Sequence, residues 1–289
     1  MAVKGTGLKP AGEPRVEPIP VTFGHLLREW RSARRMSQLV LATEAEISAR
    51  HLSFLESGRA QPSREMVLRL AGTLDVPLRD QNTLLTAAGY APLHRETGLG
   101  APEMNLVRRA LGFMLKQQEP YPAVAVDRVW NVLMQNEAAR RIFGAFLDRD
   151  AAAQVPGPPN VIRLTFHPHG LRRYIANWDA VAGPLIQQVH REAVGGIVDA
   201  DTRQLLEELL AYPGVPAHWR SPDPTAQSMP ILPLVLRKDD LAVRFFTTIT
   251  TLGTPQDITL QGLRVECFFP ADESTEDLAR RLARPVSDS

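Results

Sequence analysis

The chain has 289 residues, 44% of them apolar, which is enough for one or two domains with substantial hydrophobic cores. It has no run approaching about 18 consecutive apolar residues and no N-terminal charged segment followed by an apolar one, so we expect neither a membrane span nor a secretory signal. The single cysteine, Cys267, excludes an intrachain disulfide and disfavours a cysteine-based zinc site. Together these features predict a cytoplasmic protein.

Charge is distributed unevenly along the chain, although the net charge is only +1. Residues 1–90 hold 12 Lys and Arg against 9 Asp and Glu, and the remainder is slightly acidic. The small basic excess therefore falls where a nucleic-acid-binding surface would need it. Residues 1–21 contain seven glycines and prolines and almost no periodic apolar pattern, which predicts a flexible tail.

Residues 22–90 carry the pattern of five short helices. In the first of them, apolar residues recur at the spacing of one helix face. Ser37, Ser48 and Ser63 stand where three further helices are expected to begin, because a serine hydroxyl can accept a hydrogen bond from a free backbone N–H of the first turn. Gly58 permits the left-handed backbone conformation that ends a helix.

The strongest signal in this segment is a series of residues in fixed order. It consists of Ser37-Gln38-x-x-Leu41-Ala42, Ile47-Ser48, Leu52-Ser53-x-Leu55-Glu56-x-Gly58 and Pro62-Ser63. The series resembles the Cro/C1-type (XRE) helix-turn-helix family. The resemblance implies an all-α, five-helix domain over residues 22–90 that binds double-stranded DNA. Leu39, Leu41 and Ala42 of its second helix are expected to face the core.

In that family the third helix lies in the major groove, with its N-terminal residues on base edges. Carried over by position, Arg50 is placed to bind guanine through two hydrogen bonds, whereas Ala49 can only contact a thymine methyl. Gln38 is expected near a phosphate, where it can also brace a base-reading side chain, and Glu56 is expected to pair within the domain. The residues expected to contact DNA are Gln38, Ala49, Arg50, His51, Ser53, Ser57, Arg59 and Arg64.

Residues 91–120 contain turn residues typical of a linker, followed by the helical pattern Glu103–Gln118, which we interpret as a connecting helix. Beyond them the pattern becomes α+β, with strands, then helices, then strands. A kink or a break in the helix is expected at Gly183-Pro184. The predicted elements are strand-like Ala123–Met134, helices Asn136–Phe146, Gly170–Val194 and Asp201–Tyr212, strands Ile231–Arg237, Leu241–Thr251 and Ile258–Phe269, and a terminal helix and tail over 274–289.

A second, looser series of motifs runs through this part of the chain. Its members are Gly89-Tyr90-Ala91-Pro92, Pro122-Ala123, Asp127-Arg128-x-Trp130-x-Val132, Asn136-x-Ala138-Ala139, Phe166 and Trp178. The series resembles the C-terminal domain of MmyB-like regulators. The resemblance implies a PAS-like domain over residues 121–273, with an antiparallel sheet covered by helices on one face. It also implies a sensor with a cavity for a hydrophobic, fatty-acid-like ligand.

The ligand site is expected between the sheet and the helices. Any one of its candidate residues could equally be an ordinary core residue. The candidate wall residues are Trp130, Leu133, Phe143, Tyr174, Trp178, Leu185, Val189, Phe245 and Ile249. A carboxylate head group would need a donor, for which Arg172 is the chief candidate beside Arg173, His190 and Arg191.

The sequence therefore predicts a transcription regulator that senses a small molecule and acts as a homodimer, because one helix-turn-helix reads only half of a palindromic operator. His167-Pro168-His169 has no Asp, Glu or Cys neighbour that could complete a metal site, so no metal site is expected. The sequence contains neither a phosphate-binding loop nor a nucleophile elbow, so we expect no cofactor and no enzymatic activity. The main alternative is a C-terminal domain that serves only dimerisation or protein docking, which a dry, fully packed interior would favour. An enzyme fused to a DNA-binding domain would require converging titratable groups.

Overall fold

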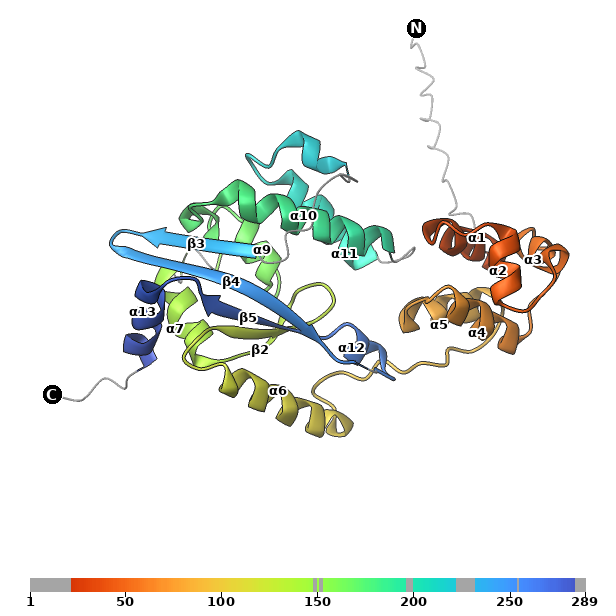
Figure 1. The fold of residues 1–289 in the computed structure, drawn as a ribbon, viewed down its shortest axis with the longest axis horizontal. Coiled ribbons are helices and arrows are strands. Elements are labelled where there is room, and N and C mark those ends of the chain that lie inside the picture. The colour runs from red at the N-terminus through yellow and green to blue at the C-terminus, as the bar shows by residue number, and fades with distance from the viewer. Residues whose placement is uncertain are drawn as a thin grey trace, which may run out of the picture.

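Figure 1 shows a helical N-terminal domain connected to a C-terminal domain built around an antiparallel sheet. This computed structural model describes residues 22–147, 150, 153–195, 200–221, 232–253 and 255–283. The tail expected over residues 1–21 and the last residues of the chain, 284–289, lie outside the described residues. The division into a five-helix domain and an α+β domain matches the fold class that the sequence predicts.

The N-terminal domain consists of α1 (Phe23–Ala33), α2 (Gln38–Glu44), α3 (Ala49–Glu56), α4 (Arg64–Thr73) and α5 (Leu78–Ala87). The three predicted serine caps are confirmed, because the hydroxyls of Ser37, Ser48 and Ser63 accept from backbone N–H groups three residues further on, at 3.2, 3.1 and 3.2 Å. Gly58 has a φ of 71°, as a left-handed helix ending requires.

The core of the helical domain depends on one very close approach between helices. A side chain at Gly24 of α1 would place its Cβ 2.6 Å from the backbone oxygens of Leu55 and Glu56 in α3. Trp30 packs in the same core and is almost completely buried. The expectation that Leu39 faces this core is wrong, since its side chain is 68% exposed and the inner face of α2 is supplied by Leu41 and Ala42.

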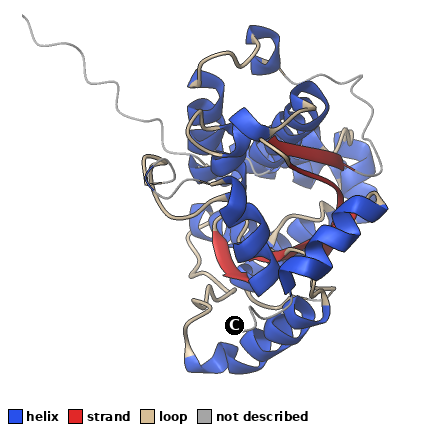
Figure 2. Ribbon diagram, turned by 90° about the vertical axis from the view of Figure 1, so that its left-hand side faces the viewer, coloured by secondary structure: helices blue, strands red, loops and turns tan. Residues whose placement is uncertain are grey.

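The C-terminal domain surrounds a five-stranded sheet of order β2-β1-β5-β4-β3, in which every neighbouring pair is antiparallel. Helices lie on both sides of the strands in the side view (Figure 2). The elements are η1 (Pro102–Met104), α6 (Asn105–Gln117), β1 (Ala123–Val126), β2 (Val132–Gln135), α7 (Glu137–Phe146), α9 (Val161–Phe166), η2 (Leu171–Tyr174), α10 (Trp178–Gly195), α11 (Ala200–Ala211), η3 (Ala217–Arg220), β3 (Leu232–Lys238), β4 (Leu241–Thr251), α12 (Ile258–Gln261), β5 (Arg264–Pro270) and α13 (Glu273–Ala283).

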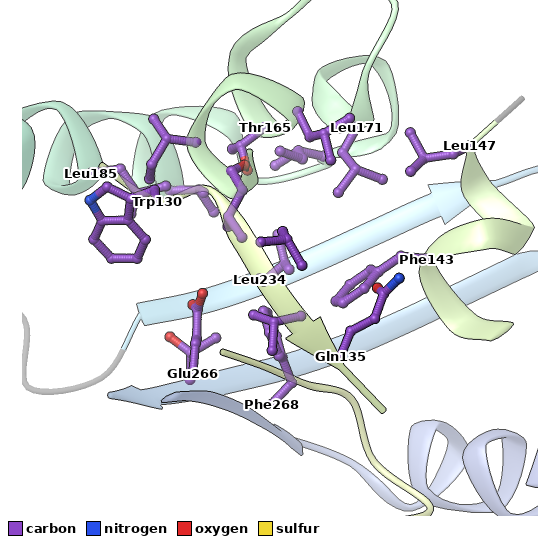
Figure 3. A pocket seen from close by; sticks show the side chains of 18 residues that line it. Trp130, Gln135, Phe143, Leu147, Thr165, Leu171, Leu185, Leu234, Glu266 and Phe268 are labelled. Atoms are coloured by element: carbon purple, nitrogen blue, oxygen red, sulfur yellow. The ribbon is translucent and has the colours of Figure 1, made fainter. Parts of the chain in front are cut away.

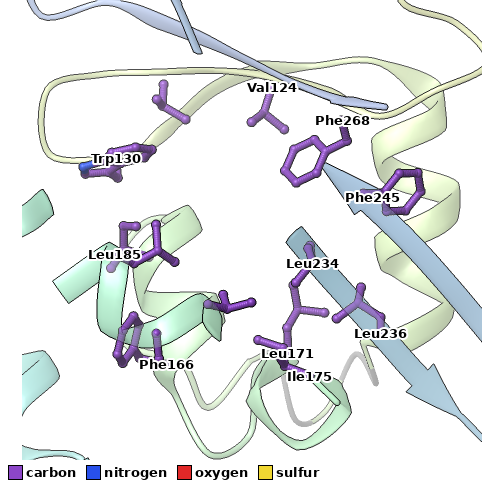
Figure 4. Packing of buried hydrophobic residues seen from close by; sticks show 14 of the residues in the cluster. Val124, Trp130, Phe166, Leu171, Ile175, Leu185, Leu234, Leu236, Phe245 and Phe268 are labelled. Carbon is purple, nitrogen blue, oxygen red and sulfur yellow. The ribbon is translucent and has the colours of Figure 1, made fainter. Parts of the chain in front are cut away.

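Strand β1 is buried on both faces, and its alternation separates two cores. Val124 and Val126 face the large layer that contains α7, α9, α10 and α11, whereas Ala123 and Ala125 pack against α6 on the opposite face. The connecting helix predicted from the sequence is therefore part of this domain, because its Leu111 covers the second face of the sheet. Figure 4 shows the side chains of the larger core.

Two predicted elements differ from those observed. Ile258–Phe269 was expected to be one strand, but Asp257 accepts from the backbone N–H of Thr259 at 2.9 Å and caps α12, so that β5 begins only at Arg264. The long helix begins at Trp178 rather than Gly170, because Asn177 bonds to the β3 backbone, donating to the Pro233 oxygen at 2.9 Å.

Of the kink or break expected at Gly183-Pro184, the break does not occur, because α10 runs on to Gly195 with Pro184 inside it.

Helix α12 connects the two domains. The backbone N–H of Leu78, at the start of α5, donates to Oε1 of Gln261 at 2.8 Å. Ile258 N–H donates to the backbone oxygen of Arg95 at 2.9 Å, and the Thr97 hydroxyl donates to the Asp257 carboxylate at 2.7 Å. The segment between β4 and β5 thus contacts both the N-terminal helical domain and the linker that leads from it.

Candidate functional site

The candidate DNA-reading helix, α3, lies at the end of the molecule remote from the sheet (Figure 1). Ala49 and Arg50 are exposed in its first turn, and His51 is half-buried. The Arg50 guanidinium lies 5.3 Å from the ring centroid of Phe54, one turn further along the helix. This stacking restricts the arginine before any contact with a base is made, which lowers the entropic cost of ordering it.

A buried ion pair fixes α3 against α1 and α2. The guanidinium of Arg31 donates two hydrogen bonds to the Glu56 carboxylate, at 2.6 and 2.9 Å, and Gln38 donates a third at 2.8 Å. Burial is the largest single influence on Glu56 and favours its neutral form, but these bonds and the nearby positive charges outweigh it and hold the pKa of the carboxyl below its usual value. The expected pairing of Glu56 within the domain is confirmed, and Gln38 is engaged in the same network.

The remaining residues expected at DNA surround the end of α3. The Ser57 hydroxyl donates to the backbone oxygen of Ser53 at 2.8 Å, so it is occupied within the helix. Ser53 is half-buried, whereas Arg59 and Arg64 are exposed on the loop and helix that follow. The eight residues expected to contact DNA thus lie on α2, α3, the segment that follows α3 and the first turn of α4.

The candidate ligand site is a cavity of about 120 Å³ between the sheet and the helices of the larger core. It is several times larger than the roughly 10–15 Å³ that one water molecule needs. Figure 3 shows labelled side chains converging on it from β2, β3, β5, α7, α9 and α10. The lining residues are mainly aliphatic and aromatic, and they are Val124, Trp130, Val132, Gln135, Phe143, Leu147, Val161, Ile162, Leu164, Thr165, Leu171, Ile175, Val181, Leu185, Leu234, Thr247, Glu266 and Phe268.

Three of the candidate ligand residues, Trp130, Phe143 and Leu185, line this cavity. Val189 and Phe245 are buried in the same core without lining it.

Tyr174 and Trp178 also lie outside the lining, because their rings pack on Phe146 and Phe166, with centroids 5.9 and 5.2 Å apart. The guanidinium of Arg172 lies 4.6 Å from the Trp178 ring centroid, away from the cavity.

Two further candidates also lie outside the lining. Leu133 packs on the α6 side of the sheet, whereas Ile249 lies on the same face as its strand partner Glu266 but is 42% exposed. The side chain of Arg191 lies outside the described residues.

Trp130 is held in an uncommon backbone conformation at the edge of the cavity. Its φ is 68°, which is rare for a bulky residue, and the preceding Asp127 carboxylate supports the turn by accepting from the N–H groups of Val129 and Asn131 at 2.9 Å. The indole Nε1–H donates to Glu192 at 3.0 Å, so the ring presents only carbon to the cavity.

Glu266 is the residue that the sequence analysis missed. It lies in the middle of β5, is 6% exposed, and points into the cavity from the sheet (Figure 3). Burial raises the pKa of its carboxyl to about 7, and a hydrogen bond with the Thr247 side chain offsets only part of that rise. The sequence held a signal, since the carboxylate interrupts an apolar strand, Val265-Glu266-Cys267-Phe268, that was expected to be buried.

Metal binding has no support in the part of the chain that the structure describes, where no group of three or more His, Cys, Asp and Glu side chains is placed to hold an ion. The rings of His167 and His169 lie 5.6 Å apart. None of the described helices is long and apolar enough to cross a membrane.

Comparison with known proteins identifies both domains. Residues 22–84 match the family described as a helix-turn-helix domain, and residues 107–282, more than half of the chain, match the MmyB-like transcription regulator ligand binding domain. No curated protein matches. Among solved structures, "Structure of an RNA-binding Light-Oxygen-Voltage Receptor" is 11% identical, with a TM-score of 0.25, and the match covers 89% of this chain and 60% of that one.

Proposed function

Because the chain belongs to the family of MmyB-like transcription regulators, we propose that it is a sequence-specific DNA-binding regulator controlled by a hydrophobic small molecule in its C-terminal domain. The two domains support a ligand-responsive transcription regulator in general terms. The specific proposal rests on one observation, the largely apolar cavity in the domain attached to the DNA-binding helices. A fatty-acid-like ligand would place its hydrocarbon chain there.

The proposed route from ligand to DNA passes through β5 and α12. Strand β5 supplies Glu266 and Phe268 to the cavity wall, and α12 immediately precedes this strand. Gln261 of α12 accepts from the backbone of α5, so a shift of β5 on ligand binding would move a contact of the DNA-binding domain. A ligand controls DNA binding in this way only if it binds one arrangement of the domains more tightly than the other.

DNA recognition is proposed to use α3 in the major groove, with Arg50 on a base edge. One such helix covers half a site, so we propose that the working form is a homodimer. Helix α6 offers a surface for a second copy of the chain, because Leu106 and Phe113 lie two turns apart and are 74% and 61% exposed. Light scattering of the wild type and of Phe113→Ser tests this, with a dimer expected to become a monomer; a monomeric wild type would refute it.

A cavity-filling substitution tests the proposed control. Leu185→Phe adds volume at the cavity wall, whereas Leu282→Phe makes the same change on the exposed surface of α13. With an operator selected from random DNA, we expect Leu185→Phe to change the operator affinity and Leu282→Phe to leave it unchanged. Equal affinities for all three proteins, with both variants folded, would favour the alternative in which the C-terminal domain serves only dimerisation or docking.

An enzymatic role is not part of the proposal. The domains are those of a transcription regulator, and Glu266 is the single titratable carboxylate among the described residues that line the cavity. A reaction centre would require several converging groups with complementary roles. We propose that the protein acts in the cytoplasm, where its operator DNA lies.

A further inference from the structure

The cavity is not uniformly apolar, because one carboxylate enters it. Glu266 is paired in register with Val124 of β1 and Ile249 of β4, so it occupies the middle of the sheet rather than an edge. The side chain projects from β5 toward the helical layer, as Figure 3 shows. Its immediate neighbours along the chain, Val265 and Cys267, face the α6 side of the sheet.

This carboxylate is only half satisfied. Thr247, on the adjacent strand, shares a hydrogen bond with it, but Oε2 is buried and has no hydrogen-bond partner among the described residues. Arg264, two residues earlier on the same face, is the nearest candidate to neutralise it. That arginine instead donates to Glu192 at 2.7 Å and lies over the Trp130 ring.

A buried carboxylate without a partner is costly, so proteins seldom retain one without a compensating contact. The rise in the pKa of Glu266 to about 7 reports the same cost, since burial disfavours the charged form. A ligand that donates a hydrogen bond would supply the missing partner of an acceptor oxygen that is aimed into a cavity.

The other polar residues that line the cavity, Trp130, Gln135, Thr165 and Thr247, are neutral and supply no cation for an anionic ligand. No Lys, Arg or His occurs among the described residues that line it. The Trp130 indole N–H is committed to Glu192, and the Thr165 hydroxyl donates to the backbone of its own helix at 2.8 Å. A ligand carboxylate in this cavity would meet Glu266 without a compensating cation.

Resting on the proposed control by a hydrophobic molecule, but with a donor head group in place of a fatty acid's carboxylate, we propose that the ligand is a small apolar molecule with an amine or hydroxyl group that donates a hydrogen bond to Oε2 of Glu266. Its apolar body lies against the aromatic and aliphatic walls, including Trp130, Phe143 and Leu185. The cavity of about 120 Å³ is similar in size to the roughly 150 Å³ apolar cavity that holds benzene. As it stands, the cavity holds a ring or a short chain. A chain of eight carbons enters it as a wall such as β5 shifts, which is the movement on which the proposed control depends.

The test uses three probes with the same eight-carbon chain and different heads: octylamine, 1-octanol and octanoate. Isothermal titration calorimetry of the full chain at pH 7.5 gives their affinities for the wild type, Glu266→Gln and the control Glu207→Gln, which makes the same change at an exposed position of α11. We expect octylamine to bind the wild type roughly tenfold or more tightly than octanoate, because a charged donor strengthens the bond to a buried carboxylate. Octanol should lie between them.

Glu266→Gln is expected to weaken octylamine binding by roughly tenfold or more and to remove the preference over octanoate, while Glu207→Gln behaves as the wild type. Octanoate binding the wild type as tightly as octylamine would overturn the inference, and that comparison needs no variant. Unchanged octylamine affinity in Glu266→Gln would overturn it as well. Failure of all three probes to bind would instead refute the cavity as a ligand site, and with it the proposed function.

Discussion

The substitution Glu266→Gln removes the buried charge while keeping the shape of the side chain, so its effect on stability should depend on pH. The carboxyl has an ordinary pKa of 4.5 and is raised to about 7 in the folded protein. A raised acid makes the folded state bind more protons than the unfolded state, so stability falls as pH rises from about 4.5 to about 7 and then levels off. A shift of about 2.5 pH units corresponds to about 3 kcal/mol at pH 8, and to less than about 1 kcal/mol at pH 5.

Urea unfolding of the full chain, followed by tryptophan fluorescence, measures this difference. Glu266→Gln should stabilise the protein at pH 8 by up to about 3 kcal/mol and change it little at pH 5, while Glu207→Gln has no effect at either pH. A variant that is neutral, or destabilised equally at both values, would show that Glu266 is paired or hydrated in solution. The reasoning from an unpartnered carboxylate would then fail.

The remaining predictions concern the DNA-binding domain. Arg50→Ala should lose about 1–3 kcal/mol of operator affinity and relax base preference at one position in binding to a randomised operator set, whereas Arg281→Ala at an exposed position of α13 should change neither; unchanged preference would place the reading residue elsewhere. Gly24→Ala should lower the melting temperature, because the added Cβ would lie 2.6 Å from backbone oxygens of α3. The control Gly72→Ala has open space around its Cβ and should raise the melting temperature slightly. Equal effects of the two variants would contradict the close approach of α1 to α3. Glu56→Gln should lower the free energy of unfolding of the N-terminal domain in urea by about 3–5 kcal/mol, because Arg31 loses its buried carboxylate partner. A loss below about 1 kcal/mol would show that this ion pair does not hold α3 in place.

The DNA-binding domain could be predicted almost residue by residue because its signals are local. Ser37, Ser48 and Ser63 act on backbone groups three residues away, so the sequence itself contains both partners of each bond. Leu39 shows the limit of such local signals. Helix α2 is short and buries only Leu41 and Ala42, so Leu39, which was expected in the core, lies on its outer face with 68% of its side chain exposed.

The ligand cavity was harder to predict because its walls come from distant elements. The strands and most helices of the C-terminal domain were foreseen, but which face of β2 bounds the cavity depends on register, so Leu133 was placed on the wrong side. Ile249 lies on the cavity face of β4, opposite Glu266, but too far along the strand to line the cavity. Helix α12 interrupts an otherwise strand-like pattern because of a single cap, Asp257. Glu266 could not be recognised as a cavity residue from the sequence, because the fold places it beside Val124 and Trp130, which are far from it along the chain.

The most direct test of the account is the coupling between the cavity and the operator. Fluorescence anisotropy of labelled operator DNA, with and without saturating octylamine, measures it in the wild type and in Leu185→Phe. The account predicts that octylamine changes the operator affinity of the wild type by roughly fivefold or more and leaves that of Leu185→Phe unchanged. Operator should in turn change the octylamine affinity of the wild type by the same factor, because coupling between two binding sites is reciprocal. Identical operator affinities with and without a probe that calorimetry shows to be bound would contradict ligand control.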